Sequence, residues 1–416
     1  MSKAIEYCKN VFDGTHDTPK PTESGYKLLT SKNILNGNLD KANAYFISKE
    51  DYEAINKRSK VQQWDVLFSM IGTVGNVCLI TEENIDFAIK NMGVFSCEDE
   101  KKAKWLYYYL QSPYAKQLMQ NYLNGAIQKF LPLEWLRNLQ IPDYDSSKEN
   151  IVQILWSIDS KIVQNNSVYT ELESMAKTLY DYWFTQFDFP NEEGKPYRSS
   201  GGAMEWNEQL KREIPSGWKT DNIQNTCSVI DCLHSQKPEQ LYAAENYYLL
   251  QLENLVDLGL IDLHSKYYVS KDMYELWTSR IQVEDGDLVV TNAGRVGAVS
   301  RIPQHVIAGI GRNMTAIRPN TIPPFFLYYF FKSPDFSVQM RANTDSGAFF
   351  GSLNVRGIKQ LLLTVPPASS DILKRFDSIV EPMRRKIESL QLENEELTRL
   401  RDWLLPMLMN GQATVE

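Results

Sequence analysis

The chain has 416 residues, of which 43% are hydrophobic and 23% are charged, which is typical of a globular protein with two or three domains. Its 44 basic and 52 acidic residues give a net charge of −8, so the overall charge does not favour nonspecific attraction to nucleic acid or acidic membranes. Five scattered cysteines without CxxC spacing, no long apolar run and no secretory leader at the start predict reduced thiols and a cytoplasmic location.

The first elements predicted along the chain belong to an α+β module. A run of β-branched and aromatic residues from Asp65 to Ser69 predicts a strand, and the pair of glycines in Gly72-Thr-Val-Gly75 is typical of a hairpin turn. A helix is expected from Ala103 to Asn121, with Pro113 as a point of interruption.

A long helix is predicted next, over residues 146–187, because apolar residues recur at alternating steps of three and four. This stripe consists of Ile151, Leu155, Ile158, Ile162, Tyr169, Leu172, Ala176, Leu179 and Trp183. The residues after it are rich in Gly, Pro and Ser, so segment 188–216 is predicted to be a linker or an extended surface loop.

The second half of the chain repeats the first at an offset of 222 residues, which carries Trp64 onto Gly286 and Val77 onto Val299. Matches extend upstream and downstream of this segment, so one module occurs twice. The modules are predicted at 1–145 and 217–367. Each is followed by a long helix, 146–187 and 368–410, and the two apolar stripes would be buried most simply by packing these helices together.

Sequence signatures of catalysis are missing. None of the four histidines lies in an HExxH motif, and there is no phosphate-binding GxxxxGK[ST] loop. Ile322-Pro-Pro-Phe325 resembles the methyltransferase motif in which Asp or Asn precedes Pro-Pro, but isoleucine replaces the polar residue. No carboxylate cluster suited to Mg²⁺ stands out. The chain is therefore predicted not to be an enzyme, and no cofactor or metal is expected in it.

Basic residues are concentrated in the second module. Residues 289–366 contain eight basic and two acidic residues, which predicts a local basic surface, and most of the basic residues are arginines that can grip guanine or phosphate. The two Gly-x-x-Gly turns keep their glycines while Thr73 changes to Arg295, as expected of two modules that bind different ligands. His16 and His234 recur at equivalent places. Two roles stay open for them, a structural hydrogen bond and a contact with phosphate.

Several motifs together resemble the specificity subunit of type I restriction-modification enzymes. They are Asp13-Gly-Thr-His16, the two Gly-x-x-Gly turns, the run from Leu179 to Pro190, the run from Lys211 to Trp218, and Leu400-Arg-Asp-Trp-Leu-Leu-Pro406. The resemblance implies two target recognition domains, each followed by a long helix, with the helices packed as an antiparallel coiled coil that relates the domains by a pseudo-twofold axis.

The resemblance also implies a function. Such a subunit binds a bipartite double-stranded DNA target with one half site per domain, and it docks two modification subunits and, in the full complex, restriction subunits. S-adenosylmethionine, ATP and Mg²⁺ would be bound by those partners. Two alternatives stay open: a protein-binding assembly scaffold with two duplicated modules, and a DNA methyltransferase in its own right.

Polarity and position in the repeat indicate which residues contact DNA in each half site. For the first half site they are Thr73, Asn76, Lys90, Asn91, Gln128 and Lys129. For the second half site they are Arg295, Arg312, Asn313, Arg341, Ser352 and Arg356.

Overall fold

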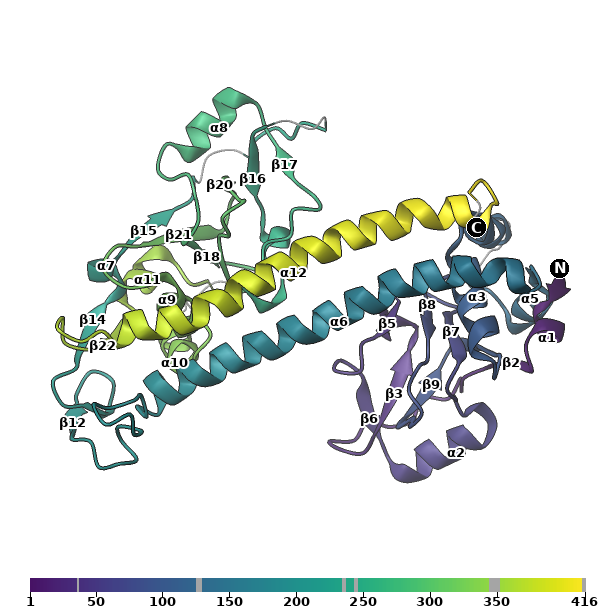
Figure 1. The fold of residues 1–416 in the computed structure, drawn as a ribbon, viewed down its shortest axis with the longest axis horizontal. Coiled ribbons are helices and arrows are strands. Elements are labelled where there is room, and N and C mark those ends of the chain that lie inside the picture. The colour runs from purple at the N-terminus through teal and green to yellow at the C-terminus, as the bar shows by residue number, and fades with distance from the viewer. Residues whose placement is uncertain (36, 125–128, 234–236, 243–245, 344–351, 414–416) are drawn as a thin grey trace. The chain divides into compact units, whose positions relative to one another are not determined.

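The computed structural model describes residues 1–416 except 36, 125–128, 234–236, 243–245, 344–351 and 414–416. The chain divides into two compact units. The first unit is Met1–Val163 with Asn394–Glu416, and the second is Gln164–Glu393. Both contain helices and sheets (Figure 1), so the expected α+β class is confirmed.

The first unit is built on a four-stranded antiparallel sheet of order β2-β10-β7-β8 and a three-stranded sheet of order β6-β3-β9. Its strands are β1 (Ser2–Lys3), β2 (Asn10–Asp13), β3 (Tyr26–Thr30), β4 (Ile34–Leu35), β5 (Asn38–Leu39), β6 (Tyr45–Ile47), β7 (Asp65–Ser69), β8 (Val77–Leu79), β9 (Phe87–Lys90), β10 (Met92–Ser96) and β11 (Gln140–Ile141). The shorter helices are α1 (Ala4–Tyr7), α2 (Lys49–Ser59), α3 (Glu100–Gln111), α4 (Pro113–Asn124) and α5 (Leu133–Asn138).

Two of these elements test the sequence predictions directly. β7 has the predicted bounds, Asp65–Ser69. The helix expected from Ala103 to Asn121 is interrupted at Pro113 as predicted, and it forms two helices, α3 and α4. Proline has no backbone N–H to continue the helical hydrogen bonds, so it starts the second helix where its fixed φ is favourable.

The second unit repeats this topology. Its four-stranded sheet has the order β15-β21-β18-β19 and its three-stranded sheet the order β17-β16-β20. The strands are β12 (Met204–Asn207), β13 (Arg212–Pro215), β14 (Lys219–Asn222), β15 (Cys227–Asp231), β16 (Tyr248–Leu250), β17 (Tyr267–Tyr268), β18 (Leu288–Thr291), β19 (Val299–Arg301), β20 (Gly309–Ile310), β21 (Met314–Pro319) and β22 (Leu362–Val365). The shorter helices are α7 (Ile223–Thr226), α8 (Lys271–Thr278), α9 (Pro324–Phe330), α10 (Pro334–Asn343) and α11 (Val355–Gln360).

The register of the central strands follows the repeat as well. Ser69 of β7 lies opposite Met92 of β10, and Thr291 of β18 lies opposite Met314 of β21. Both pairs are related by the offset of 222 residues found in the sequence. The duplication is therefore a duplication of strand pairing, and equivalent positions in the two modules can be compared residue by residue.

Two long helices contribute to both units. They are α6 (Glu149–Tyr180), continued by a π-helical turn at Asp181–Thr185, and α12 (Ile372–Met409). In the first unit Asp159 of α6 forms an ion pair with Arg401 of α12, and Val152 and Leu155 share a core with Leu405 and Leu408.

In the second unit Glu173 of α6 forms an ion pair with Arg384 of α12, and the Tyr180 ring contacts the Phe376 ring at 5.8 Å between centroids. Rising residue numbers on α6 thus meet falling residue numbers on α12 inside each unit. The parts of the two helices that each unit contains therefore pack side by side and run antiparallel.

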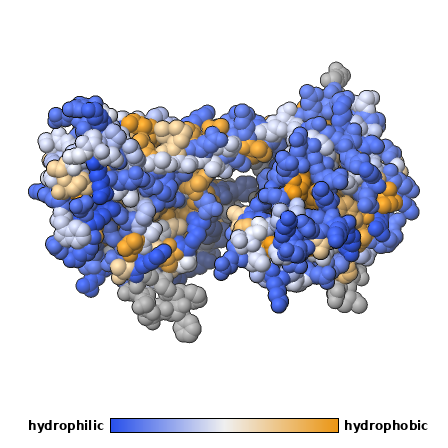
Figure 2. Space-filling model, turned by 90° about the horizontal axis from the view of Figure 1, so that it is seen from below, coloured by the Kyte–Doolittle hydropathy of each residue, from blue (hydrophilic) through white to orange (hydrophobic). Residues whose placement is uncertain are grey.

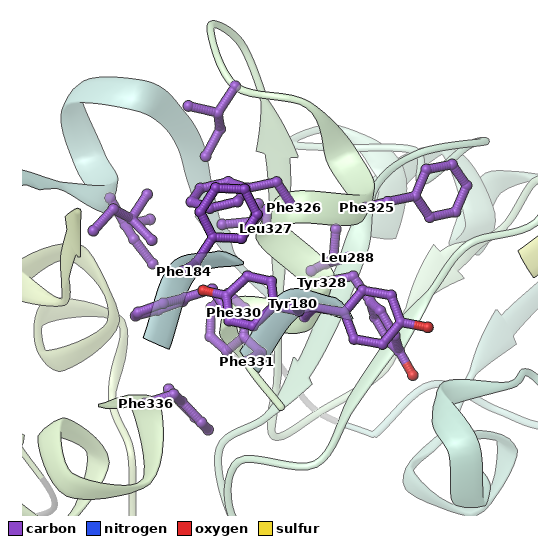
Figure 3. Close-up of a cluster of buried hydrophobic side chains, with 14 of the residues drawn as sticks. Tyr180, Phe184, Leu288, Phe325, Phe326, Leu327, Tyr328, Phe330, Phe331 and Phe336 are labelled. Carbon is purple, nitrogen blue, oxygen red and sulfur yellow. The ribbon is translucent and has the colours of Figure 1, made fainter. Parts of the chain in front are cut away.

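The core of the second unit is unusually aromatic. Figure 3 shows Tyr180 and Phe184 packed among the aromatic residues of α9, and Phe184 meets Phe326 edge to face at 4.9 Å. Phe325 is buried as well, and the Arg301 guanidinium lies 4.3 Å from its ring centroid. Ile322-Pro-Pro-Phe325 therefore provides the start of α9 and part of this core, which accounts for its residues without any catalytic role.

The segment 188–216, predicted to be a linker or an extended surface loop, contains regular structure and buried side chains. It contains the hairpin of β12 and β13, and both Phe189 and Ile214 are buried in the core of the second unit. Phe189 stacks on Trp218 at 5.0 Å, and the Asp188 carboxylate accepts hydrogen bonds from the N–H and hydroxyl of Ser199. The expectation of a linker was wrong because the few apolar residues of the segment anchor it in the core. The Gly, Pro and Ser residues indicated its turns correctly.

Hydrophobic residues on the face in Figure 2 form small groups among hydrophilic ones. Within the described ranges, every helix is too short or too polar to be a candidate membrane span.

Candidate nucleic-acid interface

The end of the four-stranded sheet gathers most of the predicted residues of the first module. Because β7 ends at Ser69 directly opposite the start of β10 at Met92, the turn after β7 and Asn91 before β10 lie at the same end of the sheet. Ile71 in that turn forms a β-bridge with Phe130, which places the exposed Lys129 beside it. Thr73 at the tip of the turn is exposed.

Two of the remaining predicted residues of the first module make hydrogen bonds within the module. The Asn76 side chain donates to the carbonyl of Ile34 at 3.1 Å, and the Lys90 ammonium contacts the Thr18 hydroxyl. Asn76 therefore braces the turn from inside. Gln128 lies outside the described residues.

His16 is held by side chains rather than by backbone. Its Nδ1 is hydrogen-bonded to Asn91 Oδ1 at 2.9 Å, and its Nε2 lies 3.0 Å from the Asp13 carboxylate, which also forms an ion pair with Arg58. This network fixes the orientation of the Asn91 side chain at the sheet end. The equivalent His234 lies outside the described residues.

Both Gly-x-x-Gly turns require glycine. Gly72 and Gly75 have φ of 77° and 96°, and Gly294 and Gly297 both have φ of 76°, which is the left-handed region that other residues adopt at a cost. The preceding hydroxyl closes each turn: Ser69 Oγ accepts from the Asn76 N–H at 2.8 Å, and the Thr291 hydroxyl accepts from Ala298 at 3.0 Å.

We expect Gly72→Ala to lower the free energy of unfolding by about 1–2 kcal/mol. A Cβ at Gly72 would meet nothing within 4 Å, so the whole cost is backbone strain. Thr73→Ala, one residue further in the same turn, is the matched control and should change the stability by less than about 0.5 kcal/mol. Urea unfolding of the two variants measures this difference, and equal effects would contradict the strain argument.

In the second unit, one residue that the sequence analysis missed joins the predicted segments. The Asn292 N–H donates to the Asn313 carbonyl at 2.8 Å, its carbonyl accepts from Leu353 N–H at 3.0 Å, and its side chain donates to Leu353 O and to the Thr315 hydroxyl, both at 2.9 Å. Asn292 thus brings the Arg295 turn, Asn313 and Ser352 together. Its counterpart in the repeat is Met70, so the only available signal was a polar residue replacing an apolar one.

The other predicted residues of the second module lie on neighbouring elements. Arg341 is near the end of α10 and Arg356 is in α11, and these two helices pack against one another. Asn313 has a φ of 63° and its counterpart Asn91 a φ of 54°, so both modules place an asparagine in the left-handed conformation at this end of the sheet. Asparagine tolerates that conformation better than most residues.

The expected basic surface of residues 289–366 is smaller than the residue count predicted. Two of its arginines, Arg301 and Arg318, are neutralised by acidic residues that lie outside this stretch of sequence. Arg301 is buried and forms ion pairs with Asp285 at 2.7 Å and Glu388 at 3.0 Å. Arg318 pairs with Asp287 at 2.6 Å.

Arg295, the expected central contact of the second half site, is also engaged. Its guanidinium donates to Asp257 at 3.2 Å and to the carbonyl of Leu255 at 2.9 Å. Arg312, Arg341 and Arg356 are exposed, and none of them has an ion-pair partner among the described residues. Among the six arginines of residues 289–366, these three are therefore the ones without an acidic partner. The two lysines of this stretch, Lys332 and Lys359, are half-buried.

A hollow of about 710 Å³ opens beside the first turn. It is lined by Thr30, Ser31, Lys32, Asn33, Asp40, Asn43, Ala44, Tyr45, Ile71, Gly72, Lys90 and Asn91. Two predicted residues, Lys90 and Asn91, thus share a wall with the 3₁₀ helix η1 (Ser31–Asn33), which the sequence analysis did not consider. Over the described ranges, no group of three or more His, Cys, Asp or Glu side chains is placed to hold a metal ion.

Comparisons with known proteins point in one direction. Residues 15–174 match the model of the family described as Type I restriction modification DNA specificity domain. The chain is 21% identical over 321 residues to the type I restriction enzyme MjaIX specificity subunit of Methanocaldococcus jannaschii, a match that covers 77% of this chain and 71% of that relative. It is 23% identical over 323 residues to the HindI specificity subunit of Haemophilus influenzae, with 66% and 69% covered.

A solved structure extends the likeness to the fold. The crystal structure of the S subunit of a type I restriction-modification system from M. genitalium aligns with a TM-score of 0.57 at 16% sequence identity, and covers 98% of this chain and 95% of that chain. These matches confirm the resemblance seen in the sequence motifs: the chain is similar to the specificity subunits of type I restriction-modification systems.

Proposed function

We propose that the chain is the DNA-recognition subunit of a type I restriction-modification complex and binds a bipartite target, with one half site for each module. One observation carries this proposal. Both modules place a glycine turn and a left-handed asparagine at the same end of the same four-stranded sheet, and the exposed side chains on this shared frame differ. Two copies of one frame with different polar side chains suit the reading of two different base sequences.

In this proposal the basic side chains of the candidate interface have different roles. Arg312, Arg341 and Arg356 contact phosphates or guanine edges of the second half site, and Lys129 does so in the first. Arg295, because it is tied to Asp257 and Leu255, positions the turn. Thr73, Asn91, Asn313 and Ser352 supply the shorter polar groups.

The long helices serve assembly in this proposal. The antiparallel packing present inside each unit would extend along the whole of α6 and α12 as a coiled coil and relate the modules by a pseudo-twofold axis. Two modification subunits dock on the subunit, and restriction subunits join the full complex in the cytoplasm. We assign S-adenosylmethionine, ATP and Mg²⁺ to those partners and no catalytic step to this chain.

Arg312→Ala is expected to weaken binding of the cognate DNA by about 1–3 kcal/mol if the arginine contacts a base, and to relax the sequence preference in the second half site alone. The measurement is fluorescence-monitored binding of a DNA library by the complex reconstituted with its modification subunits, at a fixed salt concentration because affinity depends strongly on salt. Arg399→Ala removes an exposed arginine paired with Glu396 on α12 and should leave both half sites unchanged.

The same experiment separates the alternatives. If the assembled complex with the unmodified chain has no preference for any DNA sequence, the proposal is wrong and an assembly scaffold that binds only proteins is favoured. Binding of S-adenosylmethionine to this chain alone in equilibrium dialysis would favour a methyltransferase instead.

A further inference from the structure

A short 3₁₀ helix forms a second wall beside the glycine turn in both modules. In the first module it is η1, and in the second it is η4 (Leu252–Asn254). The Ser31 hydroxyl donates to the Asn91 carbonyl at 2.9 Å, and the Leu252 side chain lies 3.8 Å from where a Cβ of Gly294 would be. Each 3₁₀ helix therefore adjoins the candidate interface of its own module.

A buried asparagine holds each of these helices in the same way. The Thr30 N–H donates to Asn33 Oδ1 at 2.9 Å, and the Asn33 amide donates to the Asp40 carbonyl at 3.0 Å. Asn254 repeats both bonds, accepting from Gln251 N–H at 2.7 Å and donating to the Asp262 carbonyl at 2.7 Å. Because both ends of the helix are fixed by internal hydrogen bonds, the residue in its middle is presented from a rigid support.

That middle residue is Lys32 in the first module and Glu253 in the second. Both side chains are exposed. Neither has a hydrogen-bond or ion-pair partner among the described residues, and Lys32 lines the same hollow as Lys90 and Asn91. The repeat thus keeps the support and reverses the charge that it presents.

The two charges suit opposite base edges. A lysine ammonium only donates hydrogen bonds, and it matches the O6 and N7 acceptors of guanine; a carboxylate only accepts, and it matches the N4 amino group of cytosine. A carboxylate is repelled by phosphate, so a glutamate that faces DNA at this position gains only from a base donor.

We infer that Lys32 and Glu253 are specificity-determining residues, Lys32 selecting an acceptor edge such as guanine in the first half site and Glu253 selecting a donor edge such as cytosine in the second. This inference rests on the proposed function, because it assumes that each module reads one half site. It adds a second reading element to the residues of the glycine turns.

The test uses the complex reconstituted with its modification subunits and a randomised DNA library. Glu253→Gln is expected to reduce discrimination at one base pair of the second half site by about 5- to 150-fold, with the first half site unchanged. Lys32→Gln should do the same at one base pair of the first half site. Lys60→Gln and Glu239→Gln, which change exposed and unpaired charges elsewhere in the described chain, are the matched controls and should alter neither preference.

Two other outcomes would overturn the inference. If Lys32→Gln weakens binding to all sequences alike and Glu253→Gln strengthens it alike, the residues contribute only general electrostatics. If neither variant changes any preference, they do not face the DNA. In both cases the unmodified complex still selects its bipartite target, whereas failure of the proposed function itself would appear as an unmodified complex without any sequence preference.

Discussion

Glu173→Ala is expected to lower the free energy of unfolding of the second unit by about 3–5 kcal/mol. The Arg384 side chain is completely buried, and its guanidinium forms an ion pair with Glu173 at 2.5 Å. The same carboxylate accepts hydrogen bonds from the Tyr329 hydroxyl at 2.7 Å and the Tyr328 hydroxyl at 3.2 Å. Removing it leaves a buried cation without its counter-ion and the Tyr329 hydroxyl without its acceptor, which costs more than the loss of a surface ion pair. The Tyr328 hydroxyl keeps its hydrogen bond to the Leu258 carbonyl at 2.8 Å.

The first unit offers a matched control. There the Tyr108 hydroxyl donates to Asp159 at 2.7 Å, and Asp159 pairs with Arg401 at 3.0 Å. The side chains of this pair retain 16% and 23% of their exposure, so Asp159→Ala should cost less, about 1–3 kcal/mol.

Urea unfolding followed by a signal specific to each unit measures both effects. The double variant Glu173→Ala with Arg384→Met should recover much of the loss, since it removes the unpaired charge together with its partner. A change of less than about 1 kcal/mol in Glu173→Ala would contradict the buried-cation argument. In both units these clusters tie a helix of the α+β module, α3 or α9, to the long helices.

The second large effect is a loss of stability of the first unit as the pH rises. Burial raises the pKa of Asp65 from its ordinary value of 3.8 to about 6. One carboxylate oxygen accepts from the Gln62 N–H at 2.8 Å, and the other has no partner in the described part of the chain. Between pH 4 and pH 6 the unfolded chain has released this proton while the folded unit keeps it, so stability falls with rising pH through this window by about 3 kcal/mol and is constant above it.

Asp65→Asn should remove this pH dependence and raise the stability at pH 8 by up to about 3 kcal/mol. Asp287 occupies the same position in the second module and provides the contrast. Its carboxylate pairs with Arg318 at 2.6 Å, so Asp287→Asn should lower the stability of the second unit by about 1–3 kcal/mol. Urea unfolding at pH 5 and pH 8 distinguishes the two variants, and a change of the same sign in both at pH 8 would show that the repeat treats the two aspartates alike.

The sequence was sufficient to predict the duplicated frame. β7 has the predicted bounds, and the glycine pairs lie in turns as predicted, where all four glycines have positive φ. These features depend on local rules, because a turn at positive φ restricts which residue can occupy it. The regular three- and four-residue steps likewise predicted helices that the structure has at Glu149–Tyr180 and Ile372–Met409.

The candidate interface was predictable only in part. Strand register brings the glycine turn and Asn91 together. The sequence indicated these two features because each recurs in the second module at the offset of the repeat. Asn292 joins segments about sixty residues apart through its bond to Leu353, and the 3₁₀ helices reach the interface from another sheet. Such neighbours have no fixed spacing along the chain, so a reading based on spacing missed them.

The sequence by itself thus determined that one α+β module occurs twice, where its turns lie and that long helices follow, because these properties are set by residue type and short-range periodicity. Only the tertiary structure decided which charges remain available to a partner. Arg301 does not contribute to the expected basic surface because it pairs with Glu388, 87 residues away. Arg318 does not contribute because it pairs with Asp287. The physical reason is that burial and ion pairing are decided by neighbours in space, which a count of charges along the chain does not contain.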